Sequence, residues 1–397
     1  MRALPIHRPT QETSNMRQRA KYVLLILFVI QLHPFAFAEN PAGPATGLSN
    51  ALQQIQQLGP QGSGHREAIV AWQQIASRPA SDLPAILSGM SDDNPLADNW
   101  IRAAVDAISE RVLQANQAYP VAELEAYLED RSHAPRSRRL AYEWIVRADP
   151  AAKSRIIPSL IDDPSLELRR EAVSALLTRA DQAKTDGKQG AAIAMYRSSL
   201  EAARDVDQID TATKQLRELG ETVDLPEHFG FIMNWHLIAP FDNTNQAGFD
   251  QAYPPEKTID LAGSYEGKEG TVTWIEHTTE DEFGKVDLNT ALEKHKGAIA
   301  YAVATFESED ARPADLRLGC INANKIWLNG QELTANDVYH AGRGIDQYVG
   351  TGQLKAGKNT ILLKICQNEQ TESWAQDWEF QLRVCDHLGT AILAADR

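Results

Sequence analysis

The sequence predicts a multidomain α + β protein, with an N-terminal α-solenoid of helical hairpins and a C-terminal antiparallel jelly-roll β-sandwich. Three observations support this. Residues 48–220 carry apolar positions at helical spacing, residues 229–397 carry short alternating runs bounded by Gly, Asn and Pro, and residues 221–228 between them have the pattern of a linker. A chain of 397 residues also has the length of about two or three domains.

The N-terminal residues have the pattern of a signal peptide. Three basic residues within 17–21 precede an apolar run over 22–32, and Ala36-Phe37-Ala38 supplies the small residues of a cleavage site. The apolar run is well short of the roughly 20 residues that a membrane span needs. We therefore expect residues 1–38 to be removed, residues 39–47 to form a linker, and the mature chain to be periplasmic or extracellular with no membrane span.

The balance of charged residues narrows the range of expected binding partners. The chain has 54 Asp and Glu residues against 39 Lys and Arg residues, which gives a formal net charge of −15 at pH 7. An acidic surface repels phosphate backbones, so nucleic acid is not an expected partner.

All three cysteines, Cys320, Cys366 and Cys385, lie in the C-terminal part. Their odd number leaves at least one thiol unpaired in a monomer. Strand alternation predicts that Cys320 lies in the core and that the other two lie on the more polar faces of their strands, where a bridge between them stays possible. The spacing does not match a zinc site, and we expect no metal and no cofactor.

The helical region contains a repeated unit. Each unit has an apolar helix, an acidic turn and a second helix with the pattern Arg-x-Ala, and the period of roughly 31–37 residues is typical of an α-solenoid. Packing within the repeat is the expected role of these arginines. The three units run over residues 83–105, 124–142 and 157–173.

Residues 161–173 resemble the turn and second helix of a HEAT repeat. The resemblance implies that an Asp of this segment caps or brackets the turn, that an Arg ties helix to helix, and that the small Ala lets the helices approach. Residues 187–219 look more like a TPR hairpin, which could cap the stack. Such repeats imply a surface that binds a protein partner.

The C-terminal part contains about eight short predicted strands, with little helix between them. Asn329-Gly330 supplies the positive φ angles of a type I′ turn between two of the strands. The predicted strands are Phe231–Ala239, Gly270–His277, Ile299–Phe306, Ala314–Cys320, Lys325–Leu328, Glu332–Leu333, Thr360–Cys366 and Trp378–Cys385.

An ordered series of motifs runs through these strands. It comprises W-x-x-x-x-P-F-D-N at 235–243, Y-P-P-E at 253–256, V-T-W at 272–274, W-L-N-G at 327–330, L-K-A-G-K-N at 354–359 and W-E-F-Q-L-R at 378–383. Together the motifs resemble the galactose-binding-like β-sandwich, with the closest likeness to the sugar-binding-type domain of family 2 glycoside hydrolases. This resemblance covers residues 229–394 and implies carbohydrate binding. We expect Trp235, Trp274 and Trp327 to fill the core between the sheets.

Binding residues in such sandwiches lie in loops that the rigid sheets present. Two loops combine aromatic, charged and amide side chains, Tyr339–Tyr348 and Asn368–Trp378. Trp374 is the first candidate for an exposed platform on which a sugar ring stacks. For His340, Arg343 and Asp346 the alternative role is to anchor the loop through hydrogen bonds and ion pairs. The candidate ligand-binding residues are His340, Arg343, Asp346, Tyr348, Trp374 and Trp378.

No catalytic motif is present. The chain lacks G-x-S-x-G, H-E-x-x-H, P-loop and G-x-G-x-x-G patterns, and no eight-fold βα pattern could supply the barrel on which family 2 hydrolases carry their catalytic groups. We therefore expect an exported non-catalytic protein that binds carbohydrate through the sandwich and protein through the helical repeats. Two alternatives stay open: an assembly scaffold whose sandwich binds protein, and a carbohydrate-active enzyme or its accessory subunit.

Overall fold

The computed structural model describes residues 44–342 and 344–396. The predicted signal peptide, residues 39–43 of the predicted linker and Arg343 lie outside the described residues. The chain divides into two compact units, Met1–Gly47 and Leu48–Arg397. Of the first unit, the structure describes only residues 44–47, where helix α1 begins. All other described residues belong to the second unit.

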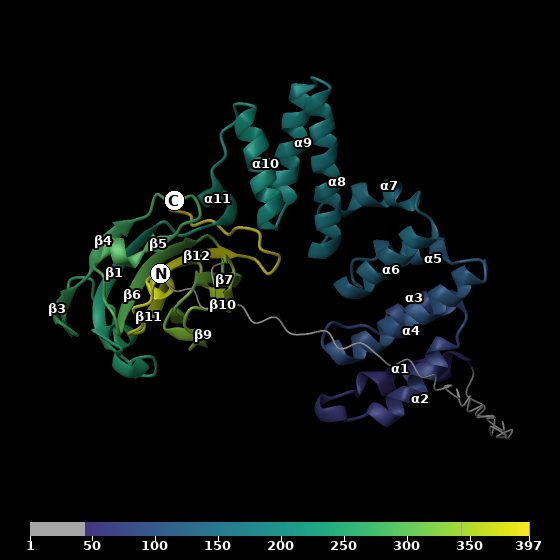
Figure 1. The fold of residues 1–397 in the computed structure, drawn as a ribbon, viewed down its shortest axis with the longest axis horizontal. Helices are drawn as coiled ribbons and strands as arrows, with labels where there is room; N and C mark the ends of the chain where they lie inside the picture. The colour runs from purple at the N-terminus through teal and green to yellow at the C-terminus, as the bar shows by residue number, and fades with distance from the viewer. Residues whose placement is uncertain (1–43, 343, 397) are drawn as a thin grey trace, which may run out of the picture. The chain divides into compact units, whose positions relative to one another are not determined.

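The protein combines helices with antiparallel sheets (Figure 1). Local sequence explains where several helices begin: Asn94 accepts hydrogen bonds from the backbone N–H groups of Leu96 and Ala97, and proline follows at the first helical position of α4. Over the described ranges, no helix has both the length and the apolar character needed to cross a membrane. The described α-helices are α1 Pro44–Gln56, α2 His65–Ala76, α3 Leu83–Leu87, α4 Pro95–Gln114, α5 Val121–Glu129, α6 Pro135–Ala148, α7 Ala152–Ile156, α8 Leu166–Thr185, α9 Gln189–Ala202, α10 Val206–Glu218, α11 Leu225–Phe229, α12 Pro254–Lys257 and α13 Leu288–Ala291.

The Arg-x-Ala arginines link consecutive units of the helical region. Each guanidinium reaches a carboxylate on the second helix of the next unit, from α4 to α6, from α6 to α8 and from α8 to α10. Two of these arginines also pair within their own helix, as packing within one repeat would predict. The pairs within a helix are Arg102–Asp106 at 3.9 Å and Arg139–Glu143 at 3.0 Å. The pairs between consecutive units are Arg102–Glu143 at 2.8 Å, Arg139–Glu171 at 3.3 Å and Arg170–Asp207 at 2.6 Å.

Asp163 holds the turn before α8. Its carboxylate accepts two hydrogen bonds from Arg138 at 2.8 and 2.7 Å and one from the backbone N–H of Ser165 at 2.8 Å. The side chains of Asp163 and Arg138 are both only 1% exposed. Arg169 donates to the backbone oxygen of Asp163 at 2.8 Å. Arg138 and Arg169 therefore hold this turn, while Arg170 links α8 to α10 at the surface.

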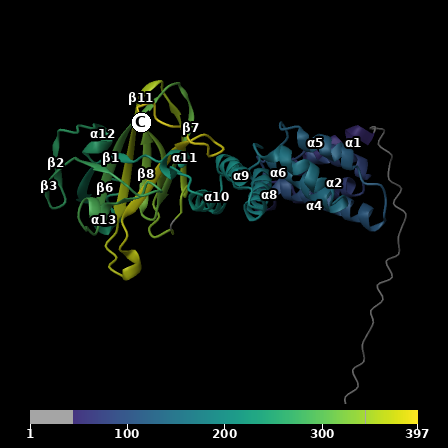
Figure 2. The same ribbon diagram turned by 90° about the horizontal axis from the view of Figure 1, so that it is seen from above.

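The strands form two principal sheets and one small hairpin (Figures 1 and 2). The six-stranded sheet has the order β4-β1-β6-β11-β8-β9, the four-stranded sheet has the order β10-β7-β12-β5, and β2 pairs with β3. Every neighbouring pair is antiparallel. The strands are β1 Asn234–Asp242, β2 Ser264–Gly267, β3 Gly270–Thr273, β4 Ile275–Thr278, β5 Val286–Asp287, β6 Ala298–Ser308, β7 Arg312–Cys320, β8 Ala323–Leu328, β9 Gln331–Asn336, β10 Tyr348–Leu354, β11 Gly357–Gln367 and β12 Glu379–Cys385.

The central strands of the six-stranded sheet, β6, β11 and β8, are largely buried on both faces, whereas the edge strands β4 and β9 are largely exposed. One face shares a core with the four-stranded sheet, and the other forms a second core beneath the segment that carries Phe249 and Tyr253. Strand β11 shows the alternation between the two: Leu363 lies in the first core, whereas Leu362 and Cys366 lie in the second. At its central strands, both faces of this sheet are therefore largely apolar.

Two tryptophan predictions need correction for this reason. Trp235 lies in the core between the two sheets, as expected. Trp274 and Trp327 lie instead in the second core, on the outer face of the six-stranded sheet. Neighbouring residues of a strand face opposite sides, so Ile326 takes the inner face and Trp327 the outer one.

The cysteine prediction is corrected in the same way. Cys320, Cys366 and Cys385 are all buried and all free, so no bridge joins Cys366 to Cys385. Cys320 lies in the core between the sheets, as predicted. The other two do not lie on polar faces, because Cys366 belongs to the second core and Cys385 is 0% exposed.

The sequence prediction missed β10, because two glycines interrupt its apolar alternation. A Cβ atom on Gly350 would lie 2.9 Å from Leu333 Cβ, and one on Gly352 would lie 2.9 Å from Leu328 Cδ2. Close packing against β8 and β9 therefore excludes side chains at these two positions. The predicted turn at Asn329-Gly330 is confirmed, with φ angles of 53° and 82°.

Within the predicted linker 221–228, a short helix begins. Leu225 and Phe229 of α11 are 3% and 2% exposed and belong to one apolar cluster with residues of α8, α9 and α10. Asp224 caps this helix by accepting a hydrogen bond from the backbone N–H of Glu227 at 2.9 Å.

Candidate functional site

Two of the predicted binding residues, Trp374 and His340, lie together. Trp374 is 57% exposed in a short 3₁₀ turn, Ser373–Ala375. The edge of one ring meets the face of the other, with 5.0 Å between the ring centroids and 85° between the ring planes. We call this group the loop site; it comprises Tyr339, His340, Asn368, Gln370 and Trp374.

The buried amide of Asn368 connects His340 to Gln370 within the loop site. His340 Nε2 lies 3.3 Å from Asn368 Oδ1, and Asn368 Nδ2 donates to Gln370 Oε1 at 2.8 Å. Asn368 is only 3% exposed, so its rotamer is fixed by its surroundings. His340 Nδ1 is buried without a hydrogen-bond partner among the described residues. The loop site therefore presents the exposed ring of Trp374 with the half-buried side chains of His340 and Gln370, while the buried Asn368 contacts both of these side chains.

The backbone of the loop is also constrained. His340 adopts a φ of +58°, a conformation that side chains with a Cβ rarely adopt. Tyr339 accepts a hydrogen bond at its hydroxyl from Asn243 Nδ2 at 3.0 Å. Burial raises the pKa of Tyr339 above its usual value, so this hydroxyl stays protonated at neutral pH.

Two other predicted residues lie elsewhere. Asp346 forms ion pairs with Arg383 and, at 3.2 Å, with Arg317. Although burial opposes its ionisation, these two arginines hold the pKa of Asp346 below its usual value. This agrees with the alternative role of loop anchoring. Tyr348 is half-buried at the start of β10 and packs against the core between the sheets.

Trp378 is not available to a ligand in this structure. Its side chain is 0% exposed, and its indole N–H donates to the backbone oxygen of Ile365 at 3.3 Å. Trp378 was a candidate because it ends the loop Asn368–Trp378, but its ring is a core residue. Arg343, the remaining candidate, lies outside the described residues.

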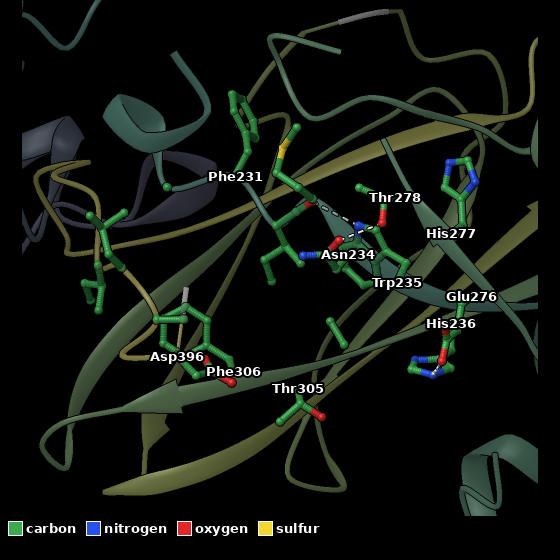
Figure 3. Close-up of a pocket in the computed structure, with 17 residues that line it drawn as sticks. Phe231, Asn234, Trp235, His236, Glu276, His277, Thr278, Thr305, Phe306 and Asp396 are labelled. Carbon is green, nitrogen blue, oxygen red and sulfur yellow. Dashed lines mark hydrogen bonds and ion pairs between the residues drawn. The ribbon is translucent and has the colours of Figure 1, made fainter. Parts of the chain in front are cut away.

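A cavity of about 420 Å³ lies at the end of the six-stranded sheet where β1 meets the edge strand β4 (Figure 3). We call it the edge cavity. His236 pairs with Glu276 at 3.7 Å, and Thr278 donates to Asn234 Oδ1 at 2.8 Å. Figure 3 shows these pairs along one side, with Phe306 and Asp396 across from them.

The edge cavity has no lysine or arginine among its described lining residues, whereas Glu276 and Asp396 both line it. Burial lowers the pKa of His277, another lining residue, below its usual value. The cavity is therefore suited to neutral or cationic groups rather than anions. Sequence reasoning missed it because its walls come from segments far apart in the chain.

The helical region carries an apolar groove between α2 and α4. Its volume is about 490 Å³, and Ile69, Trp72, Trp100 and Ala103 line it. Ile69 is 47% exposed, and the two tryptophans are half-buried. Trp72 and Trp100 also pack against the helical core.

The comparisons with known proteins find no matching family and only partial structural similarities. No protein-family model and no curated protein matches the chain. Several solved structures share part of their length with it, and three of them are described here. A β-glucosidase from Kluyveromyces marxianus in complex with glucose is 13% identical, with 40% of this chain and 16% of that chain covered and a TM-score of 0.24.

The second is the GH26-CBM35 β-(1,4)-mannanase from Podospora anserina, which is 15% identical over 25% of this chain and 24% of that chain, with a TM-score of 0.14. The third is the GH31 α-xylosidase from Xanthomonas citri, which is 10% identical over 39% of this chain and 16% of that chain, with a TM-score of 0.18. The chain spans less than a quarter of each of these structures. Similarities of this size carry no argument about its fold or activity.

Proposed function

We propose that the chain is an exported, non-catalytic binding protein whose β-sandwich binds carbohydrate and whose helical region binds protein. One observation carries the carbohydrate proposal: the exposed ring of Trp374 stands beside His340, and the buried Asn368 links His340 to the half-buried amide of Gln370. The C–H face of a sugar ring stacks on an aromatic ring, and its hydroxyls need donors and acceptors of this kind.

The finer description of the fold belongs to the same proposal. Arginine pairs between consecutive units support an α-solenoid of HEAT-like repeats. A common core between two antiparallel sheets supports a galactose-binding-like jelly roll. The signal-peptide pattern of residues 1–38 supports export to the periplasm or the exterior.

A glycan array followed by calorimetry tests the carbohydrate proposal. We expect the purified chain to bind a defined class of glycan. In Trp374→Ala the affinity should fall at least about tenfold, because the stacking face is lost. The melting temperature should stay unchanged, since the ring is already largely exposed to water.

Two control variants make the result specific. Leu261→Ala removes another exposed apolar side chain, 45% exposed, and should leave glycan binding intact. Glu276→Gln reports on the edge cavity. If Glu276→Gln abolishes binding and Trp374→Ala does not, the sugar binds in the edge cavity and the loop site is the wrong location. If the wild-type chain binds no glycan, the carbohydrate proposal fails.

The apolar groove between α2 and α4 supports protein binding by the helical region, because its exposed side chains would be covered by an apolar segment of a partner. A photo-crosslinking residue at position 69 should yield one defined adduct in the native host. The same residue at position 153, where the Lys153 side chain is 54% exposed, should not. The adduct must then be reproduced with the purified partner, and failure to do so contradicts the proposal.

A further inference from the structure

A small pocket in the second unit is lined by residues within 201–209, 228–229 and 383–391, among them Arg204 and Arg383. It has a volume of about 160 Å³. A single water needs roughly 15 Å³ measured in this way, so the pocket has room for a polyatomic group. We call it the arginine pocket; the lining residues used below are Arg204, His228, Arg383, Gly389 and Thr390.

Arg204 is a cation without a carboxylate partner among the described residues. It donates to the backbone oxygens of Glu201 at 2.8 Å and Ala203 at 2.7 Å and to Thr390 Oγ1 at 2.9 Å. The first two bonds satisfy carbonyl groups at the C-terminal end of α9. These bonds use three of the five N–H donors of a guanidinium. The Nε group of Arg204 is buried and has no acceptor among the described residues.

Further positive charge surrounds the arginine pocket. Gly389 adopts a φ of +80°, and a Cβ atom there would lie 3.2 Å from Arg317 Nη1, 3.2 Å from Arg383 Nη2 and 3.7 Å from Arg204 Cδ. Arg317 and Arg383 share the carboxylate of Asp346. Glycine is therefore the residue that lets the three arginine side chains approach one another.

The pKa values of Arg204 and His228 reflect burial first and the neighbouring arginine charges second. Burial, followed by the charges of Arg169 and Arg383, lowers the pKa of Arg204 to about 10, although Asp386 acts in the opposite direction. Burial, followed by the charges of Arg204 and Arg383, lowers the pKa of His228 to about 4. At neutral pH the imidazole of His228 is uncharged and can donate one N–H.

We propose that the arginine pocket binds a small oxyanion, either phosphate, sulfate or the carboxylate of a small molecule, with Arg204 as its principal ligand and His228 and Arg383 beside it. Two N–H groups of one guanidinium suit two oxygens of an oxyanion. This inference is independent of the proposed carbohydrate function, because none of its residues belongs to the loop site or the edge cavity.

Calorimetric melting of the purified chain at pH 7 tests the proposal. Sodium phosphate, sulfate and acetate are each compared with chloride at equal ionic strength. A ligand that binds only the native state raises the melting temperature in a saturable way. We expect saturable stabilisation by at least one of the three anions, and their order separates phosphate and sulfate from carboxylate.

Two variants locate the effect. Arg204→Gln should weaken the apparent affinity for that anion at least about tenfold, because two charge-assisted hydrogen bonds are lost. Arg136→Gln removes a guanidinium that is 56% exposed and should leave the affinity unchanged. Phosphate and sulfate also stabilise proteins in general, because they are excluded from protein surfaces. The rise in melting temperature that remains in Arg204→Gln measures this non-specific stabilisation.

A second measurement needs no variant. Titration of the His228 imidazole by NMR should show its pKa rising from about 4 when the anion is added, because a negative charge favours the protonated ring. If no anion gives saturable stabilisation, or if the effect is equal in Arg204→Gln and the His228 pKa does not move, the proposal is wrong.

Discussion

Buried charges at single residues are stabilised by several partners at once. Lys364 is 0% exposed, and its ammonium group donates to the backbone oxygens of Phe249 at 3.0 Å and Gln251 at 2.8 Å and to Glu256 Oε1 at 2.9 Å. Glu256 also accepts a hydrogen bond from the Tyr301 hydroxyl. One lysine thus fixes the segment that covers the second core.

We predict that Lys364→Ala lowers the free energy of unfolding by about 3–5 kcal/mol, because it leaves a largely buried carboxylate without its cation. Urea denaturation measures the change. Lys153→Ala, on a side chain that is 54% exposed, should change stability by less than about 0.5 kcal/mol. Adding Glu256→Gln to Lys364→Ala should recover part of the loss, and an additive double variant would contradict the coupling.

His228 should make stability depend on pH. Its folded pKa of about 4 lies below the usual 6.5, so between these values the unfolded chain binds a proton that the folded chain does not. Stability should therefore fall as the pH drops from 6.5 towards 4, with a slope of up to about 1.4 kcal/mol per pH unit.

Chemical denaturation across this pH range measures that slope in a buffer free of phosphate, sulfate and carboxylates. His228→Gln should flatten it, whereas His387→Gln, at an exposed position, should not. Equal slopes in the wild type and His228→Gln would show that His228 titrates normally.

At the scale of the element, turns are held by side chains that reach several strands. Asn359 at the start of β11 is 0% exposed. Its amide donates to the backbone oxygens of Phe306, Lys355 and Gly357, and its oxygen accepts from the backbone N–H of Lys355 at 2.8 Å. The L-K-A-G-K-N motif is therefore a structural turn, in which the final Asn connects β6, β10 and β11.

We predict that Asn359→Ala lowers the free energy of unfolding by about 2–4 kcal/mol, because it leaves buried backbone groups without partners. Asn99→Ala, at an exposed position of α4, should have an effect below about 0.5 kcal/mol. Thermal and urea denaturation of the two variants provide the comparison. A small effect at Asn359 would mean that water replaces its hydrogen bonds.

At the scale of the whole molecule, the six-stranded sheet separates two apolar cores. The cysteines of β7, β11 and β12 are buried in the interior, and none is bonded to another. Burial raises the pKa of Cys320 to about 12 and that of Cys385 to about 11, and it also raises the pKa of Cys366. Protonated buried thiols react slowly.

We predict that a thiol reagent at pH 8 modifies none of the three cysteines in the native chain within minutes and all three after denaturation without reductant. Mass spectrometry counts the adducts. A single adduct on the denatured chain would reveal a disulfide. Rapid labelling of the native chain would show that one of the strands opens.

Much of the secondary structure could be predicted because local pattern determines it. Period-3.6 apolar positions marked the helices, and alternating residues marked strands such as β7 and β8. β10 could not be predicted, since Gly350 and Gly352 are needed by neighbours on β8 and β9 rather than by their own strand. The two loops of the candidate site were predicted from the sequence. Among the candidate residues that the structure describes, only His340 and Trp374 lie together.

The sequence by itself determined the helical and sheet-forming parts, the Asn329-Gly330 turn and the exposed character of Trp374, because each depends on a few adjacent residues. Only the tertiary structure decided that Trp378, Cys366 and Cys385 are buried. It also decided which residues form the edge cavity and the arginine pocket. Both faces of a sheet become buried only when distant segments cover them, and a pocket forms only where such segments meet.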